Sequence, residues 1–506
     1  MTVSDLISLE EVEAWNSGDI ITIAAPTGKG KSHFIKNSVY EVAKQNGKRI
    51  LFLVHRTNCY TQFADDLQEK VEDGEIVQED KTDIIDLKTY QSIDMQNSNK
   101  NIPDFNLNKY DYIVCDEFHY FMSDASFNGT TDVSLEAILN ESDAVRILVS
   151  ATSKYMKYYL KELNEFETID YEFEPDTNFI ERLEFYYNDN VLEKYIDGAI
   201  KKQLKSIFFI DNTKKAYELH MKYKDITFFN CAKGNDYYRY VNDKQIENML
   251  INKGFDKVDE DGNEDSTAGK LILITTSVMD AGVSILDDDL KHIVCDIKDT
   301  EKLIQCIGRK RRKEGEKIIL HIKALSNKQL GGIESSAKIN NKHADYLKEH
   351  GEIEYIKEYG REYDKTNTIY IKNKEEGGLE LVVNEMRYTH NFIKYKEMLH
   401  MKKFNSKHNY CEYIKSKFKA EEYTIYSLES EQKKIELENY LSGILGNRLS
   451  KNEQKELIEI IDLKVNGRMI RSYEKLNQGL EMLNLKYRIT AKKSNSTRYW
   501  TIEKLK

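Results

Sequence analysis

The sequence predicts an α/β protein in which two tandem parallel sheets, each flanked by helices, precede a mainly helical C-terminal region. Short runs rich in Ile, Val and Leu alternate with amphipathic segments over residues 1–325, a pattern typical of buried parallel strands. The alternation pauses near 174–180, where Pro175 and Asn178 favour a connection. At 506 residues the chain is long enough for two or three domains.

The strand-like runs fall into two sets of similar design. The first set comprises Ile20–Ala24, Arg49–Val54, Ile84–Lys88, Tyr112–Cys115 and Val145–Val149. The second set comprises Ser206–Ile210, Ile226–Asn230, Leu271–Thr275, His292–Cys295 and Lys317–Ile322. Within the second set, Asp256–Gly269 is acidic, but its glycine is misplaced for a calcium-binding loop, so we expect a solvated surface loop.

After Ala324, strand-like runs become scarce and Lys, Glu, Tyr and Leu recur at helical spacing, with an interruption near Glu375–Gly378. We therefore expect four regions. They are a first α/β domain at 1–175, a second at 176–325, a helical accessory region at 326–430 and a basic helical region at 431–506.

Composition excludes several classes of protein. No stretch approaches about 18 apolar residues, which argues against a transmembrane span. The acidic start, Met1 to Trp15, is unlike a secretory signal, and the six cysteines are scattered without a CxxC pair. These features predict a cytoplasmic protein with reduced thiols and no membrane partner. The net charge of −11 does not exclude a polyanion partner, because a local basic groove is sufficient.

The segment Ala25–Ser32 reads APTGKGKS and lies between a predicted strand and a predicted helix, as a phosphate-binding loop does. Its glycines allow successive N–H groups to point at phosphate oxygens. The candidate nucleotide-binding residues are Thr27, Gly28, Lys29, Gly30, Lys31 and Ser32. Lys31 would reach the β- and γ-phosphates, and Ser32 would bind Mg²⁺. The alternative is a glycine turn with an incidental lysine.

A pair of carboxylates, Asp116 and Glu117, follows the strand-like run Tyr112–Cys115. The carboxyl ends of parallel strands face the ligand crevice of an open α/β sheet. Asp116 is a candidate ligand of Mg²⁺, and Glu117 is a candidate base for the attacking water. Alone, such a pair is often only a polar start to a loop.

The order of these motifs resembles superfamily 2 helicases of the DExH type, from about Ile20 to Arg312. Besides APTGKGKS and DEFH, the matching segments are Leu53–Phe63, Leu87–Ser92, Ser150–Thr152, Ile207–Thr213, Thr275–Gly282 and Gln305–Arg312. The resemblance implies that both α/β domains are RecA-like and that ATP and Mg²⁺ are the cofactors. Two departures stand out: Ser284 occupies a position that is often acidic in the family, and the upstream adenine-reading glutamine is missing.

The resemblance also implies roles for particular residues. Arg309 and Arg312 would reach the γ-phosphate from the second domain, and Gln305 would contact the nucleotide or the water. Gly282 is expected beside the nucleotide. Coupling between the ATP site and the interdomain surface would pass through His119, Ser150 and Thr152, and the sugar-phosphate backbone would meet Arg56, Thr89, Thr275 and Thr276. The simpler readings are a helix cap for Ser150–Thr152 and a surface charge for Arg56.

The C-terminal stretch 464–506 holds eleven basic residues against three acidic ones, a local charge of +8 on an otherwise acidic chain. A capping box at Ser450–Glu453, a helical pattern at Met469–Leu483 and alternating runs at Leu485–Thr490 and Arg498–Ile502 resemble a winged helix. Lys492, Lys493 and Arg498 are candidate contacts to nucleic acid. Tyr499 and Trp500 would either stack on bases or pack the hairpin, and packing is favoured for Trp500.

Together these features predict an ATP-dependent helicase or translocase that acts on a single strand of DNA or RNA, with DNA favoured. The alternative is a nucleotide-switched sensor or clamp that hydrolyses ATP without unwinding and recruits a protein partner through Leu325–Tyr426. A P-loop kinase or small-molecule ATPase fits poorly with an arginine motif in a second α/β unit.

Overall fold

A computed structural model describes most of the chain, and every structural statement below concerns the described residues. These are 2–26, 28–55, 84–98, 105–126, 128–173, 179–255, 266–277, 285–311, 313, 315–360, 366, 368–373, 378–461, 464–465, 468–483, 485–494 and 497–505. The chain divides into two compact units, Met1–Phe185 with Ile196–Tyr423, and Tyr186–Tyr195 with Thr424–Lys506.

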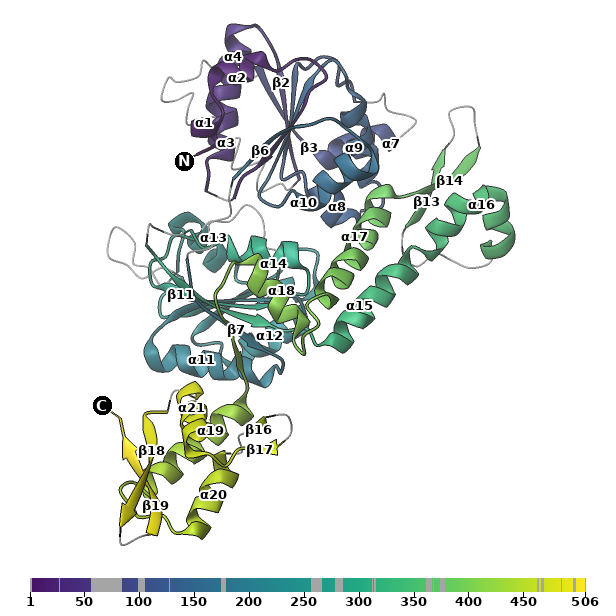
Figure 1. Cartoon of the computed structure of the whole chain (residues 1–506). Helices are drawn as coiled ribbons and strands as arrows, with labels where there is room; N and C mark the ends of the chain where they lie inside the picture. Colours follow the sequence, from purple (N-terminus) through teal and green to yellow (C-terminus); the bar gives the residue numbers. More distant parts are fainter. Residues whose placement is uncertain are drawn as a thin grey trace, which may run out of the picture. The chain divides into compact units, whose positions relative to one another are not determined.

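The first domain is built on a parallel sheet with the strand order β3-β2-β4-β5-β1-β6 (Figure 1). Its strands are β1 (Ile20–Ala24), β2 (Ile50–Val54), β3 (Ile85–Thr89), β4 (Tyr112–Asp116), β5 (Val145–Ser150) and β6 (Ile169–Glu172). Its helices are α1 (Val3–Leu6), α2 (Leu9–Ala14), α3 (Lys31–Phe34), η1 (Ile35–Val39), α4 (Tyr40–Gln45), α7 (Tyr90–Ser98), α8 (Tyr120–Ser123), η2 (Asp124–Ser126), α9 (Thr131–Asn140), α10 (Lys154–Lys157) and η3 (Tyr158–Leu163).

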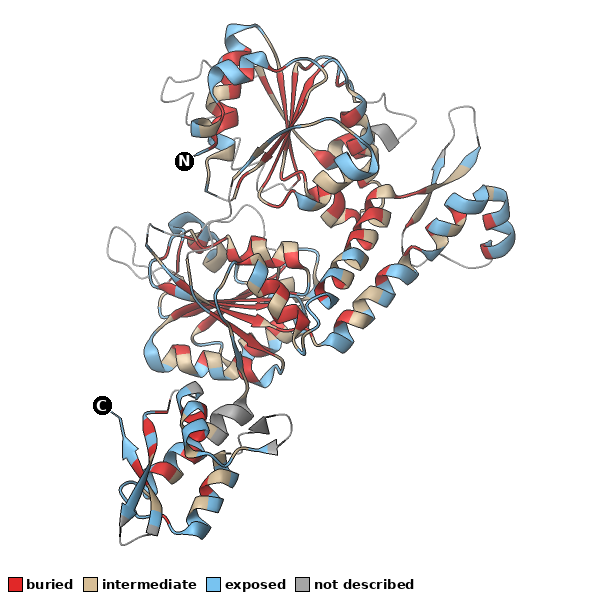
Figure 2. Ribbon diagram, in the orientation of Figure 1, coloured by how far each residue is buried: buried red, intermediate tan, exposed pale blue. Residues whose placement is uncertain are grey.

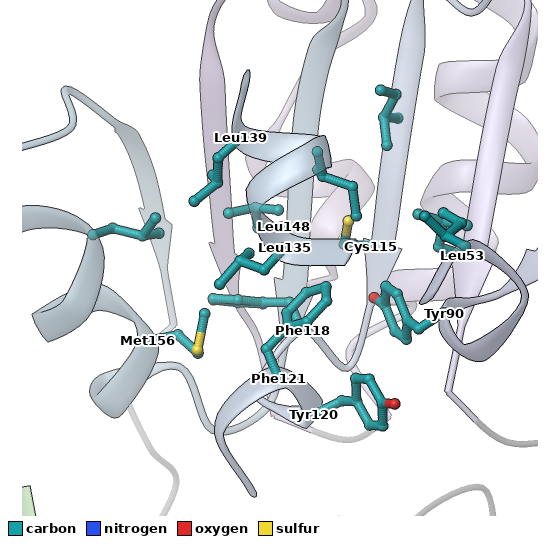
Figure 3. Close-up of a cluster of buried hydrophobic side chains, with 14 of the residues drawn as sticks. Leu53, Tyr90, Cys115, Phe118, Tyr120, Phe121, Leu135, Leu139, Leu148 and Met156 are labelled. Carbon is teal, nitrogen blue, oxygen red and sulfur yellow. The ribbon is translucent and has the colours of Figure 1, made fainter. Parts of the chain in front are cut away.

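Helices cover both faces of this sheet, which explains why its central strands are apolar along their whole length. Ile23 and Phe52 belong to the core shared with α1–α4. Leu53 and Leu148 face the opposite core, where Phe118 and its neighbours pack (Figure 3). The central strands are buried along their length (Figure 2). Successive strand residues alternate between these two cores, so both must be hydrophobic.

The second domain, in the same unit, contains a sheet with the order β7-β12-β11-β8-β10-β9 (Figure 1). Its strands are β7 (Ile180–Tyr186), β8 (Lys205–Ile210), β9 (Thr227–Asn230), β10 (Ile272–Thr275), β11 (Leu290–Asp296) and β12 (Ile318–Lys323). Its helices are α11 (Asn190–Lys202), α12 (Thr213–Lys222), η4 (Asp236–Tyr240), α13 (Asp243–Asn252) and α14 (Thr300–Ile307).

All ten strand-like runs of the sequence are strands, within a residue or two at each end. The two tandem RecA-like sheets are thereby confirmed. Strands β6 and β7 were not predicted, because β6 is largely exposed and the first half of β7 is exposed, so neither forms a continuous apolar run. The predicted acidic loop at 256–269 lies mostly outside the described residues.

The region after β12 is mainly helical, as predicted. It contains α15 (Asn327–Asn340), α16 (Lys342–Tyr359), α17 (Glu385–Lys402) and α18 (Asn409–Lys417). A hairpin of β13 (Ile369–Asn373) and β14 (Leu379–Val383) brackets the predicted interruption. Helix α17 contributes Met386 and Ile393 to the core of the first domain, so this region is packed on that domain.

The second unit contains β15 (Thr424–Tyr426), α19 (Leu428–Gly443), α20 (Lys451–Ile461), β16 (Lys464–Val465), β17 (Arg468–Met469), α21 (Tyr473–Met482), β18 (Tyr487–Ser494) and β19 (Thr497–Lys504). The predicted capping box is present, because Ser450 N–H donates to Glu453 and Glu453 N–H donates to Ser450 Oγ. Isolated bridges join Leu445 to Ile502 and Leu449 to Trp500, so residues 445–449 lie beside β19. Helices α20 and α21 are followed by the β18–β19 hairpin, and the winged helix stays a prediction for this region. None of the described helices is long and apolar enough to cross a bilayer.

Candidate functional site

The phosphate-binding loop curls between β1 and α3, as its glycines allow. Gly28 has φ +90° and Gly30 has φ +76°, a region that residues with a Cβ rarely adopt. Lys31 Nζ donates to Ala25 O at 3.0 Å, so the ammonium lies over the loop. Ser32 is exposed on the first turn of α3, and Lys29 O accepts a hydrogen bond from Val3 N–H. Thr27 lies outside the described residues.

Asp116 ends β4, and Glu117 follows it with φ +50°, a strained conformation for glutamate. Burial and the neighbouring Glu117 raise the pKa of Asp116 to about 7, against the effect of Lys31. Burial also tends to raise the pKa of Glu117, but Lys31 and a hydrogen bond with His119 hold it well below its usual range. Burial lowers the pKa of Lys31, while Glu117 and Asp116 oppose that shift. These three groups therefore form one electrostatic unit.

His119 lies between Glu117 and Ser150. His119 Nδ1 is 2.8 Å from Ser150 Oγ and 3.3 Å from Glu117 Oε2. Ser150 Oγ donates to Glu117 Oε2 at 3.2 Å and accepts from Thr152 N–H at 3.0 Å. Of the three residues expected to couple the ATP site to the interdomain surface, His119 and Ser150 thus contact each other and the candidate base, and Thr152 is bonded to Ser150.

Gln305 on α14 joins this network from the second domain. Its Nε2 lies 2.9 Å from His119 Nε2 and 2.7 Å from Thr152 Oγ1. An amide NH₂ has two protons, one for each of these acceptors, so His119 then carries its own proton on Nδ1, facing Ser150 and Glu117. The side chain of Gln305 is buried, and the contact spans 153 residues of sequence to Thr152.

Three arginines follow Gln305, of which Arg309 and Arg311 are among the described residues. Arg309 is only 3% exposed, its Nε donates to Gln305 O at 3.3 Å, and its charge helps to lower the pKa of Glu117. Arg311 approaches the phosphate-binding loop so closely that a Cβ on Gly28 would lie 2.8 Å from Arg311 Nη1. The predicted finger Arg312 lies outside the described residues. Sequence reasoning missed Arg311, because a run of five basic residues, 309–313, gives no signal for which of them faces the loop.

The candidate nucleic-acid contacts are dispersed. Arg56 lies outside the described residues, as does Gly282, which was expected beside the nucleotide and not the nucleic acid. Thr89 ends β3 and is partly exposed, whereas Thr275 and Thr276 are buried, so neither of these two hydroxyls lies on the surface. Lys492, Lys493 and Arg498 belong to the second unit, where all three are exposed on the β18–β19 hairpin.

The residues present fit a nucleotide with Mg²⁺. The loop carries N–H donors and a lysine at a helix N-terminus, and two carboxylates lie within electrostatic reach of that lysine. No cluster of three metal-ligating His, Cys, Asp or Glu side chains occurs among the described residues. Mg²⁺ suits such a site, because it binds through one or two carboxylates together with substrate phosphates.

A search of protein-family models matches residues 6–155 to the family described as "Type III restriction enzyme, res subunit". Over these residues the chain has a superfamily 2 helicase-type ATPase domain. A search of curated proteins finds no match.

Solved structures similar to the chain include three helicase-type proteins. Dbp5 from S. cerevisiae bound to RNA and ADP BeF3 is 18% identical, covering 64% of this chain and 85% of that one, with a TM-score of 0.44. A DEAD box protein from Methanococcus jannaschii is 20% identical, covering 65% and 88%, with a TM-score of 0.34. The DEAD-box helicase Mss116 bound to ssRNA and UDP-BeF is 15% identical, covering 67% and 81%, with a TM-score of 0.43.

Gly28→Ala is expected to weaken nucleotide binding by about tenfold or more, because the new Cβ strains the loop and meets Arg311. Gly47→Ala is the matched control, since Gly47 has φ +61° but open space around it. Both variants should lose about 1 kcal/mol of folding stability. Binding of a fluorescent ATP analogue and thermal unfolding distinguish them, and wild-type nucleotide affinity in Gly28→Ala would contradict this account of the loop.

Proposed function

We propose that this chain is an ATP-dependent helicase or translocase in which ATP hydrolysis between two RecA-like domains drives movement along a strand of nucleic acid. The observation that carries the proposal is the bonding of Gln305 to His119 and Thr152, because it links the second domain to the candidate hydrolytic residues. A P-loop protein acting on a small molecule has no need of such a connection. DNA is the proposed substrate, since the matching family model describes a restriction enzyme subunit.

Each residue of the site has a proposed task. Lys31 and the N–H groups of Gly28–Ser32 hold the phosphates, and Ser32 and Asp116 hold Mg²⁺, which neutralises phosphate charge when bound. Glu117 is ionised at neutral pH, so it is able to accept a proton from water. Arg309 and Arg311, with the predicted Arg312, bring positive charge from the second domain to the transferred group. The contact between His119 of the first domain and Gln305 of the second couples changes at the ATP site to the second domain.

The four regions predicted from the sequence, 1–175, 176–325, 326–430 and 431–506, are the proposed domains. The five described cysteines are buried free thiols, which supports the proposed cytoplasmic location. Thr89 remains a proposed backbone contact in the first domain.

Lys31→Ala and Glu117→Gln are expected to abolish nucleic-acid-stimulated ATP hydrolysis, the second by about 10²–10⁴-fold as general-base catalysis is lost. The controls Lys201→Ala and Glu162→Gln make the same changes at exposed positions on α11 and η3 and should have no effect. The assay compares single- and double-stranded DNA and RNA, with strand displacement measured in parallel. Stimulated hydrolysis without displacement or translocation would favour the sensor or clamp, and substantial turnover in Lys31→Ala would contradict the site.

We further propose that the hairpin of the winged-helix unit binds nucleic acid. Lys493 and Arg498 are cross-strand partners, and Lys492 lies beside them but pairs with Glu503 at 2.9 Å. The exposed face of α21 carries mixed charge, with Glu474 and Glu481. The β18–β19 hairpin is therefore more strongly cationic than the exposed face of α21.

The two aromatic residues of β19 differ in their surroundings. The guanidinium of Arg448 lies 3.9 Å from the ring centroid of Tyr499, so it already occupies one face of that ring. Trp500 packs against the core cluster of the unit, 6.1 Å from the Tyr473 ring. Its position favours a packing role, and the proposed contacts with nucleic acid are mainly ionic.

Replacing Lys493 and Arg498 by Ala is expected to reduce the slope of log affinity against log salt by about two, since each cation neutralises roughly one phosphate. The control replaces Lys451 and Lys455, two exposed lysines of α20, and removes the same charge. Fluorescence anisotropy with labelled oligonucleotides over a salt series measures both. An equal reduction of the salt slope in the two double variants would contradict the proposal, because it would show that binding depends on net charge and not on the hairpin.

A further inference from the structure

Helix α17 of the accessory region is anchored on the first domain. Met386 and Ile393 lie in the hydrophobic core beside Phe118 and Leu148. At its N-terminus, Asn384 Nδ2 donates to Gly129 O at 2.9 Å. Burial in that core fixes the position of α17 relative to the strands that carry Asp116 and Ser150.

The same helix reaches the N-terminus of α14, the helix that carries Gln305. Asp299 caps α14 by accepting hydrogen bonds from Glu301 N–H and Lys302 N–H. Lys394 Nζ of α17 lies 3.3 Å from Asp299 Oδ2, and His390 Nε2 lies 3.8 Å away. Although burial tends to raise the pKa of Asp299, His390 and Lys394 hold it well below its usual range. A charged cap of α14 is thus paired with α17.

Glu397, farther along α17, accepts hydrogen bonds from hydroxyl groups on three other helices. Tyr155 Oη of α10 donates to Oε2 at 2.9 Å, and Thr300 Oγ1 of α14 donates to Oε1 at 2.8 Å. Tyr413 Oη of α18 donates to Oε1 at 2.5 Å. A carboxylate has acceptor capacity for all three, and charge-assisted hydrogen bonds of this kind are stronger than neutral ones.

Two of these partners lie close in sequence to the interdomain network. Tyr155 is three residues after Thr152, and Thr300 is five residues before Gln305. The segment 152–155 and helix α14 are therefore joined twice, directly through Thr152 and Gln305 and indirectly through Tyr155, Glu397 and Thr300. Helix α14 is about 12 Å long, so fixing both of its ends fixes the direction of its axis.

We propose that Glu397 is a positioning residue for hydrolysis: it holds the N-terminus of α14 to the first domain so that Gln305 and Arg309 reach the ATP site. This inference rests on the proposed function. It assigns to the accessory region a task in coupling the two domains, in addition to any role in recruiting partners. The carboxylate of Glu397 bonds at once to Tyr155 of the first domain and Thr300 of the second, so it links the two domains in addition to the bond between Gln305 and Thr152.

The test uses the full chain with Tyr155→Phe and Thr300→Val, which remove one hydroxyl each and nearly conserve shape. Each is expected to lower kcat of nucleic-acid-stimulated ATP hydrolysis by about tenfold, since a small displacement of catalytic groups is costly, with KM for ATP nearly unchanged. The double variant should be no slower than the slower single variant, because both act through Glu397. Glu397→Gln should reproduce the defect.

Tyr413→Phe is the matched control, since it removes a hydroxyl bonded to the same carboxylate but joins α17 only to α18. It is expected to lower the melting temperature without lowering kcat. Three outcomes would overturn the inference: a wild-type kcat in both Tyr155→Phe and Thr300→Val, additive losses of kcat in their double variant, or an equal loss of kcat in Tyr413→Phe. In each case an active wild-type chain would still support the proposed function. A wild-type chain without stimulated hydrolysis would overturn the proposed function and this inference with it.

Discussion

The hydrogen bonds from one amide, the side chain of Gln305, determine how the two RecA-like domains share a site. Both of its protons are used across the domain boundary, one by the His119 ring and one by the Thr152 hydroxyl. Because the amide is buried, losing either partner leaves a polar group unsatisfied, at a cost of about 1–3 kcal/mol. This arrangement is therefore specific, and any movement that separates the domains must break both bonds.

The first domain contributes a group of interacting charges beside this interdomain contact. Lys31, Asp116 and Glu117 are grouped where burial disfavours each charged form, so each depends on its neighbours. The strained backbone at Glu117 places its carboxylate beside Ser150 and His119. Glu117 thus interacts electrostatically with Lys31 and is hydrogen-bonded through Ser150 and His119 to the network that includes Gln305, and the accessory helix α17 bonds to the other end of α14.

Much of the fold was accessible from sequence because the physical signals were local. Strands buried on both faces must be apolar throughout, so runs such as Ile50–Val54 were recognisable, and the glycines of the phosphate-binding loop left little choice of conformation. Strand β6 was not predicted, because an exposed edge strand does not need to be apolar along its length. The site residues of the first domain were also predictable, because they lie at the carboxyl ends of strands that the sequence predicts.

Other features depend on tertiary contacts that no local pattern encodes. Arg311 differs from its basic neighbours only in what it faces, and Glu397 is one of many glutamates on amphipathic helices. Its three hydroxyl partners lie 242, 97 and 16 residues away in sequence. Single-sequence reasoning has no means of pairing residues at such separations, so it left the role of the accessory region open.

The central claim is that His119 and Gln305 act as one unit across the domain boundary. The most direct measurement is a double-mutant cycle on kcat of nucleic-acid-stimulated ATP hydrolysis, with His119→Ala, Gln305→Ala and the double variant. The account predicts strong non-additivity, in which the second substitution costs little once the first is present. Fully additive losses would contradict it, because they would show that the two side chains contribute independently.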